Sequence, residues 1–209
     1  MSKQINYTNG ITLSVSKTYL YSLYLLVPVI LVFSLPYFFL WGNELFNYWE
    51  NKISFLKDNF LLQSFIYYIS GYLFRILIII ILGIVVHEVL HGLIWIFFTK
   101  KGFRSLSFGI SKPDLAPYIH CKEALPINVY RVGTVLPGIV QGILPSILGI
   151  ITGNFKVFIF GLFFTWAASG DFITLWLTRK LKSEIMVQDH PKLVGCMILE
   201  KNKLNNINK

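Results

Sequence analysis

Charged residues are scarce in this chain of 209 residues. Asp, Glu, Lys and Arg make up 14% of it, against about a quarter of an ordinary soluble domain. The chain is 55% hydrophobic and has a mean hydropathy of +0.61. This composition excludes an ordinary soluble globular protein, and we interpret the chain as a polytopic membrane protein.

Acidic residues and cysteines are also few. Their number and position bear on two possibilities, a nucleic-acid partner and a structural disulfide. Ten acids against 19 Lys and Arg leave a formal net charge of +9, which could indicate a nucleic-acid partner. The basic residues gather at the ends of apolar runs rather than in an aromatic-interleaved stripe, so we expect no nucleic acid. Cys121 and Cys196 fall on the side of the membrane that we expect to be reducing, so we expect no structural disulfide.

Four apolar segments match the roughly 20 residues that cross a bilayer as a helix. They cover residues 19–41, 71–98, 132–151 and 157–177. Two prolines, Pro28 and Pro36, are expected to kink the first segment, which lacks a signal-peptide cleavage site and should remain as an anchor. The third segment is interrupted by Pro137, Gly138 and Pro145.

The loops predict the orientation and a small hairpin. Six basic residues lie in the second loop, whereas the third loop has only Lys156, so we expect the second loop and both termini in the cytoplasm of a cell, expected to be bacterial. Alternation from Phe103 to Ile110, a turn at residues 111–114 and a return over residues 116–121 indicate two strands. This hairpin could bind an extended substrate at its edge, or it could simply connect two helices.

The expected fold is therefore an all-α polytopic membrane protein, with four transmembrane helices and a small cytoplasmic β-hairpin after the second. Its parts are a cytoplasmic flank at 1–18, a single integral-membrane domain at 19–196 and a cytoplasmic tail at 197–209. The lipid bilayer is its expected surrounding, and the sequence carries no sign of an oligomeric state.

The second apolar segment contains His87-Glu88-Val89-Leu90-His91. On a helix the two histidines share one face, so both imidazoles can reach a tetrahedral Zn²⁺, and Glu88 can act as general base on a water molecule. The alternative is that these side chains bind no metal and only form hydrogen bonds with other groups inside a packed bundle. Ionisable groups are costly within a bilayer and usually mark function there, which favours the metal site.

A catalytic zinc needs a third protein ligand. Asp171, in the fourth segment, lies about as far from the cytoplasmic end of its helix as His91 does, roughly 12 to 14 Å. We expect the two helices to run in opposite directions, and Ser169 and Gly170 to let them approach closely. The alternative for Asp171 is a carboxylate bonded to nearby Ser, Thr or Trp donors. Weaker ligand candidates are His120, Cys121 and His190.

Four stretches of this sequence resemble the bacterial DUF3267 family of zincin peptidases. They are His87–Gly92, Pro117–Glu123, Ser169-Gly170-Asp171 and Asp189-His190-Pro191. The layout is similar to that of the site-2 proteases, in which an Asp from a later helix joins the zinc motif. The resemblance implies His87, His91 and Asp171 as zinc ligands and Glu88 as catalytic base. In one departure, glycine precedes Asp171, whereas site-2 proteases have an Asp-Gly motif.

We expect from these features a single peptidase-like domain that cleaves protein or peptide substrates at the membrane, with the interrupted third segment as a gate. A metal transporter would need polar groups spread along a path across the bilayer. Here the ionisable groups of the segments cluster at one depth. A non-catalytic membrane scaffold that retains the zinc site is the third alternative, and Glu88 argues against it because an inactive site needs no base.

The charge pattern generates a topological prediction. In a variant without Cys121 and Cys196, a cysteine introduced by Asn51→Cys should react with a membrane-impermeant maleimide added outside intact cells. As a control, Lys101→Cys in the second loop should react only after the cells are permeabilised. Labelling of position 51 from the cytoplasm alone would reverse the orientation.

Overall fold

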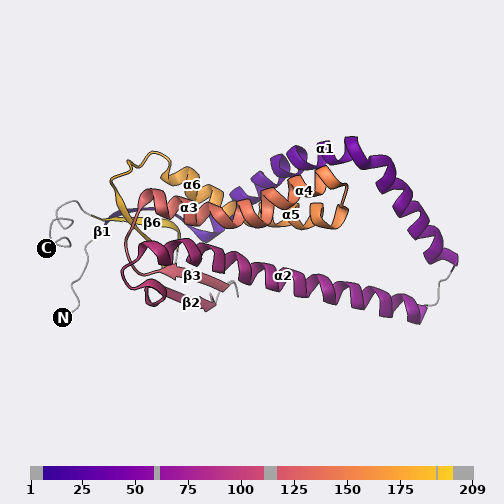
Figure 1. Ribbon diagram of the computed structural model, residues 1–209, viewed down its shortest axis with the longest axis horizontal. Helices are drawn as coiled ribbons and strands as arrows, with labels where there is room; N and C mark the ends of the chain where they lie inside the picture. Colours follow the sequence, from indigo (N-terminus) through magenta and orange to yellow (C-terminus); the bar gives the residue numbers. More distant parts are fainter. Residues whose placement is uncertain (1–6, 59–61, 111–116, 192, 200–209) are drawn as a thin grey trace.

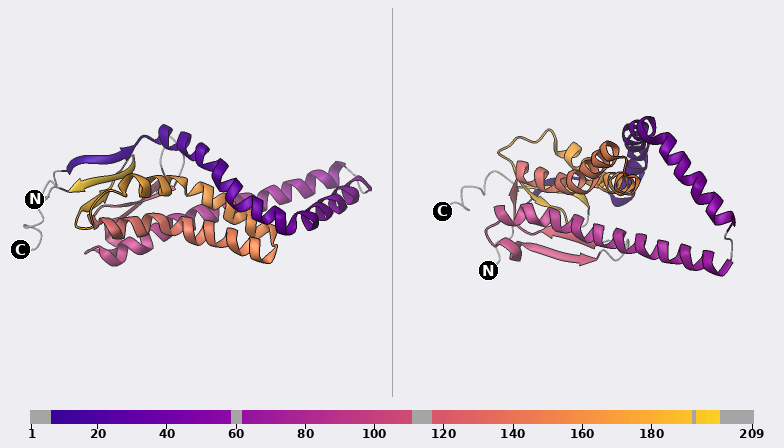
Figure 2. Two further views of the ribbon diagram at one scale, coloured as in Figure 1. Left: turned by 90° about the horizontal axis from the view of Figure 1, so that it is seen from above. Right: turned by 45° about the vertical axis from the view of Figure 1, so that its right-hand side comes forward.

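The computed structural model describes residues 7–58, 62–110, 117–191 and 193–199. The described chain is mostly helical and elongated, with long helices that run away from a group of strands at one end (Figure 1). Both described ends of the chain lie in that group, because strand β1 (Tyr7–Leu13) pairs with β6 (Val194–Leu199). The two views in Figure 2 show the same arrangement from other sides.

Each of the four predicted apolar segments is helical. The helices are α1 (Val15–Asp58), α2 (Leu62–Phe98), α3 (Ile127–Pro137) with the π-helix η2 (Gly138–Ile143) and α4 (Leu144–Thr152), and α5 (Phe155–Ala167) with α6 (Ser169–Thr178). Three are long and apolar enough to cross a membrane: α1, α2 and the α3–η2–α4 run. The α5–α6 pair, bent by 44°, is a fourth if it counts as one span.

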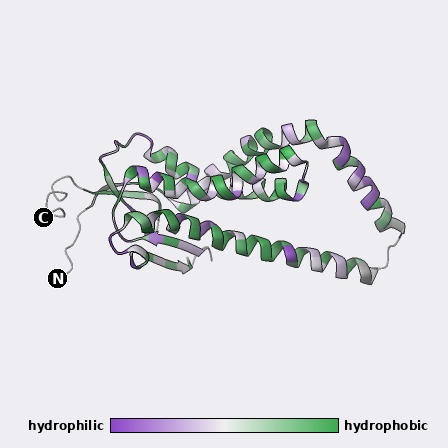
Figure 3. Ribbon diagram, viewed as in Figure 1, coloured by the Kyte–Doolittle hydropathy of each residue, from purple (hydrophilic) through white to green (hydrophobic). Residues whose placement is uncertain are grey.

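The apolar side chains of α1 and α2 are mostly exposed. Only 6% of the most hydrophobic stretch of each helix is buried. Figure 3 shows these helices largely in the colour of hydrophobic residues, with hydrophilic residues concentrated near the strands and toward the end of α1. Such a surface is suited to lipid, since a helix that is apolar on all sides is stable only in an apolar surrounding.

Two of the helical runs are irregular inside their apolar length. The third run changes from α3 to a π-helix at Pro137 and Gly138, the interruption that the sequence predicts. Proline has no backbone N–H, so Pro137 leaves the carbonyl four residues earlier, that of Gly133, without its helical donor. The fourth run breaks between α5 and α6, and Asp171 lies in the first turn of α6.

Two small antiparallel sheets correct the expectation of an all-α fold. The predicted hairpin is present as β2 (Leu106–Ile110) and β3 (Pro117–Cys121), while its turn at 111–114 lies outside the described residues. The second sheet, in the order β1-β6-β5-β4, was not predicted; it adds β5 (Met186–Asp189) and β4 (Leu125–Pro126). Its strands are short and pair over long sequence distances, and alternation along the chain does not report such pairing.

Glycines allow the backbones of α4 and α5 to lie very close together. A Cβ at Gly149 of α4 would lie 2.5 Å from the backbone N and Cα of Phe158 in α5, and one at Gly161 would lie 2.2 Å from the backbone N of Ser146. The small residues before Asp171 face α1 instead of α2: the Ser169 hydroxyl donates to the Ser22 hydroxyl, and Gly170 has only Thr18 nearby. The expected role of Ser169 and Gly170 in bringing α6 close to α2 is therefore wrong.

This packing predicts that Gly149→Ala destabilises the protein. The added methyl group would meet backbone atoms that cannot move aside, so we expect the free energy of unfolding to fall by about 1 to 3 kcal/mol. Thermal unfolding in detergent measures the effect. Gly71→Ala in α2 is the matched control, because nothing lies within 4 Å of its Cβ position, and it should be neutral or slightly stabilising. Equal stability of the two variants would contradict the packing.

Candidate metal centre

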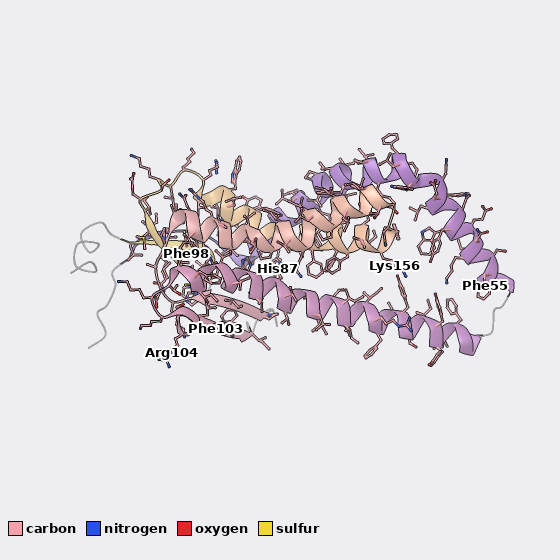
Figure 4. All side chains as sticks on the ribbon, in the orientation of Figure 1. Phe55, His87, Phe98, Phe103, Arg104 and Lys156 are labelled. Carbon is pink, nitrogen blue, oxygen red and sulfur yellow. The ribbon has the colours of Figure 1, made fainter. Side chains whose placement is uncertain are left out.

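Helix α2 presents His87, Glu88 and His91 together, as the four-residue spacing predicts. One potential ligand atom from each lies within 4.8 Å of the others, and among the described residues these three side chains form a group that could hold a metal ion. Figure 4 labels His87 on the side of α2 that faces the other helices. His91 is buried, with 7% of its surface exposed. The group therefore lies inside the protein rather than on its lipid-facing surface.

Asp171 meets both histidines. Its Oδ2 lies 3.0 Å from His87 Nε2 and its Oδ1 lies 3.5 Å from His91 Nε2. His91 and Asp171 are each seven residues from the end of their helix, or roughly 10 Å. The expected opposite directions are wrong: α2 and α6 run the same way in Figure 1, since an even number of reversals separates the second and fourth runs. Their depths match because each site lies the same distance before its own helix end.

A backbone carbonyl orients His91. Its Nδ1 lies 2.9 Å from the carbonyl oxygen of Gly133, the group that Pro137 leaves without a helical partner. A carbonyl can only accept, so Nδ1 carries the proton and Nε2 presents a lone pair when the ring is neutral. The ring of Trp95 stacks on His91 at 5.6 Å between ring centroids. A Cβ at position 133 would lie 2.1 Å from Trp95 Nε1, so this arrangement needs glycine there.

The donor set fits a zinc ion. The lone pair of His91 Nε2 faces a carboxylate oxygen of Asp171 across 3.5 Å, and two acceptors in this position are stabilised by a cation between them. Ligands of a tetrahedral zinc with bonds of about 2.0 to 2.1 Å lie roughly 3.3 to 3.5 Å apart, which is near the two distances between Asp171 and the histidines. The two imidazoles and the carboxylate are also ligand types that zinc prefers.

Glu88 makes a contact that the sequence did not predict. Its Oε2 accepts a hydrogen bond of 2.8 Å from the backbone N–H of Ile119 in β3. Gly92, one turn further along α2, allows this approach, since a Cβ there would lie 2.9 Å from Leu106 Cδ1 in β2. The hairpin therefore fixes the Glu88 carboxylate beside the histidines. No pattern in the sequence of α2 could have indicated the partner, because it is a main-chain group of another element.

The weaker ligand candidates lie outside the group of His87, Glu88 and His91. His120 Nδ1 is 3.1 Å from Asp189 Oδ2, and His190 Nδ1 accepts a hydrogen bond from the N–H of Leu193. Cys121 is fully buried on the opposite side of β3 from His120, and burial raises the pKa of its thiol to about 11. Burial likewise raises the pKa of Cys196 to about 12, and both cysteines are free. Neither these residues nor Asp171 are counted in the group of His87, Glu88 and His91, although Asp171 does contact both histidines.

A cavity of about 720 Å³ opens beside this group. Glu88, His91 and Asp171 line one part of it, and residues of β3, β5 and β6 line another. The cavity thus lies where the helices meet the two sheets. Together the residues could hold a zinc ion, a water molecule and part of a substrate, which are the parts that a metal-dependent hydrolase needs.

The comparisons with known proteins agree with this class. The sequence model of the DUF3267 family, described as "Putative zincin peptidase", matches residues 80–186. The match covers just over half of the chain and includes His87, Glu88, His91 and Asp171, so the chain belongs to the DUF3267 family. No curated protein and no solved structure matches it.

The geometry predicts that zinc binding depends on Asp171. Wild-type protein should retain one zinc per chain after dialysis against a weak chelator, measured by mass spectrometry of the metal. Asp171→Ala should lower the zinc affinity by at least about a hundredfold, because loss of a ligand exceeds the effect of losing an outer partner. Asp189→Ala, which removes another acid of the same cavity, is the control and should retain zinc. A folded Asp171→Ala variant with wild-type affinity would remove Asp171 from the ligand set.

Proposed function

We propose that this chain is a zinc-dependent intramembrane peptidase with a layout like that of the site-2 proteases. One observation carries the proposal: His87, His91 and Asp171 converge within two apolar helices, with the Glu88 carboxylate beside them. Such a group is costly in an apolar surrounding. The family description, a zincin peptidase, supports hydrolysis of peptide bonds as the reaction.

In this proposal the zinc would be held by the Nε2 atoms of His87 and His91 and by the carboxylate of Asp171. The metal, when bound, acts as a Lewis acid that activates water and polarises the substrate carbonyl. The carbonyl of Gly133 keeps the His91 ring in the tautomer that binds a cation. The start of α6 favours the negative charge of Asp171, because the partial positive charge of a helix lies at its N-terminus.

Glu88 is the general base. The N–H of Ile119 holds one of its oxygens, which leaves the second oxygen to accept a proton from the attacking water. The water oxygen then forms a bond to the carbonyl carbon of the peptide. As the oxyanion re-forms its C=O bond and the C–N bond breaks, Glu88 returns the proton to the leaving nitrogen. The products are a carboxylic acid and an amine, and the base is regenerated.

The substrate is a protein or peptide in the membrane or at its surface, and the cavity at the strand end is where it would enter. The position of the site near both described chain ends, together with the basic loops, supports access from the cytoplasm. Addition of the substrate as a strand to β3 is disfavoured. Along the edge of β3 that faces Glu88, Pro117 has no N–H and that of Ile119 already binds Glu88.

Glu88→Gln tests the reaction. Glutamine keeps the size and can still accept the Ile119 N–H, but it cannot take the proton from water. Cleavage of a helical membrane peptide in liposomes should therefore fall at least about a hundredfold, with zinc content near that of wild type. Glu123→Gln, at a carboxylate that binds the backbone of Lys100 and Lys101, is the control and should stay active.

Two outcomes would contradict the proposal. Full cleavage activity in Glu88→Gln would remove the proposed base. A wild-type protein that cleaves no membrane peptide and instead moves zinc across liposomes would be a transporter.

A further inference from the structure

A second group of polar side chains lines the same cavity and has no part in the hydrolysis described above. His120 Nδ1 lies 3.1 Å from Asp189 Oδ2, and the hydroxyl of Tyr130 lies 3.1 Å from Asp189 Oδ1. These residues come from β3, β5 and α3, and all three line the cavity with Glu88 and His91. We call them the His120 cluster.

The His120 cluster is well buried and its acid is fully engaged. The side chains of His120 and Asp189 are 14% and 17% exposed, and Tyr130 is 2% exposed. Both carboxylate oxygens of Asp189 have partners, which a buried charge requires. Stability alone does not explain the arrangement, since apolar side chains in place of a buried polar network often stabilise a protein equally well or better. Its position on a cavity points to a ligand.

Stacked rings connect the His120 cluster to the metal centre. Trp95 stacks on His91 at 5.6 Å and on Tyr130 at 5.8 Å between ring centroids, and all three rings are nearly parallel. Tyr130 in turn holds Asp189, and Asp189 holds His120. The position of His120 relative to the metal ligands is therefore set by a continuous series of contacts between buried side chains.

Within the described part of the chain, one nitrogen of His120 has no recorded hydrogen-bond partner. A carboxylate accepts hydrogen bonds, so Nδ1 of His120 donates to Asp189 and Nε2 is the nitrogen left to act in the cavity. His120 directly follows Ile119, whose N–H holds Glu88. Adjacent residues of a strand are about 3.3 Å apart and point to opposite sides. Because Glu88 and His120 both line the cavity, a peptide that occupies it can lie against both side chains.

We propose that His120 is a catalytic residue that contacts the substrate: as an imidazolium, it donates a hydrogen bond from Nε2 to the carbonyl oxygen of the scissile peptide. Asp189 and Tyr130 are positioning residues that act through it. This inference rests on the proposed peptidase function. The negative charge of Asp189 offsets that of the imidazolium, so the pair presents a donor without adding net charge to the cavity.

The donor acts when charge develops on the substrate. As the water oxygen bonds to the carbonyl carbon, the electron pair of the C=O double bond moves onto the carbonyl oxygen. The Nε2–H of His120 stabilises this oxyanion and keeps its proton throughout. The water proton passes to Glu88 and then to the leaving amine as the C–N bond breaks. A fixed donor at such an oxygen typically contributes about 10²- to 10³-fold to the rate.

Inhibitor binding tests the role without a turnover assay. A phosphinic peptide, whose tetrahedral anion mimics the oxyanion, and acetohydroxamate, which needs only the metal, are titrated into zinc-loaded protein in detergent by calorimetry. His120→Ala should weaken the phosphinic peptide about a hundredfold and change hydroxamate affinity less than twofold. His120→Gln, which keeps a neutral donor, should recover most of the loss. Ser107→Ala, opposite His120 in the neighbouring strand β2 and outside the lining of the cavity, is the matched control and should change neither affinity.

The outcomes separate this inference from the proposed function. Equal phosphinic affinity in wild type, His120→Ala and His120→Gln would overturn the role of His120, as would a wild type that binds hydroxamate but not the phosphinic peptide. Zinc-loaded wild type that fails to bind hydroxamate would overturn the peptidase site itself. Asp189→Asn should weaken only the phosphinic peptide, about tenfold; an equal loss for both inhibitors would give Asp189 a purely structural role.

Discussion

The hydrogen bond from His91 to the carbonyl of Gly133 is the contact on which the candidate site depends. It exists because Pro137 cannot donate to that carbonyl, which is then free to accept from a side chain of a neighbouring helix. The absence of a Cβ at Gly133 brings Trp95 against the same helix and onto the His91 ring. Gly133 thus fixes the tautomer, the orientation and the stacking partner of His91, a proposed zinc ligand.

The helical runs that contact α2 near His87 and His91 have irregular backbone there. The π-helix η2 carries Gln141, whose side chain donates to the carbonyl of Gly83, one turn before His87. The break between α5 and α6 places Asp171 in a first helical turn. At membrane depth, broken helices are tolerated only where protein or a water-filled cavity covers the freed polar groups. The breaks therefore lie beside polar contacts between these runs, and they supply groups that a regular helix would use in its own hydrogen bonds.

The two sheets supply the parts of the candidate site that the helices do not. The hairpin of β2 and β3 gives Glu88 its partner, and the other sheet contributes Asp189 to the cavity. Their strands come from both described ends of the chain and from the segment after α2, so the site forms only when distant parts meet. In the proposed function, the cavity between the apolar helices and the strands would give water and a peptide an approach that the apolar sides of the helices do not offer.

The sequence by itself determined the apolar helices, the hairpin after the second of them, and the shared face of His87 and His91, because these follow from local period and composition. It also selected Asp171, since a lone acid is costly in an apolar segment. That α2 and α6 run the same way already follows from the number of helical runs. Only the tertiary structure decided that small residues beside Asp171 face α1 and that Glu88 binds a strand. The second sheet and the His120 cluster are likewise features that only the tertiary structure shows. They rest on pairings between elements far apart in the chain, and no local pattern encodes a contact whose partner is a main-chain atom or a distant side chain.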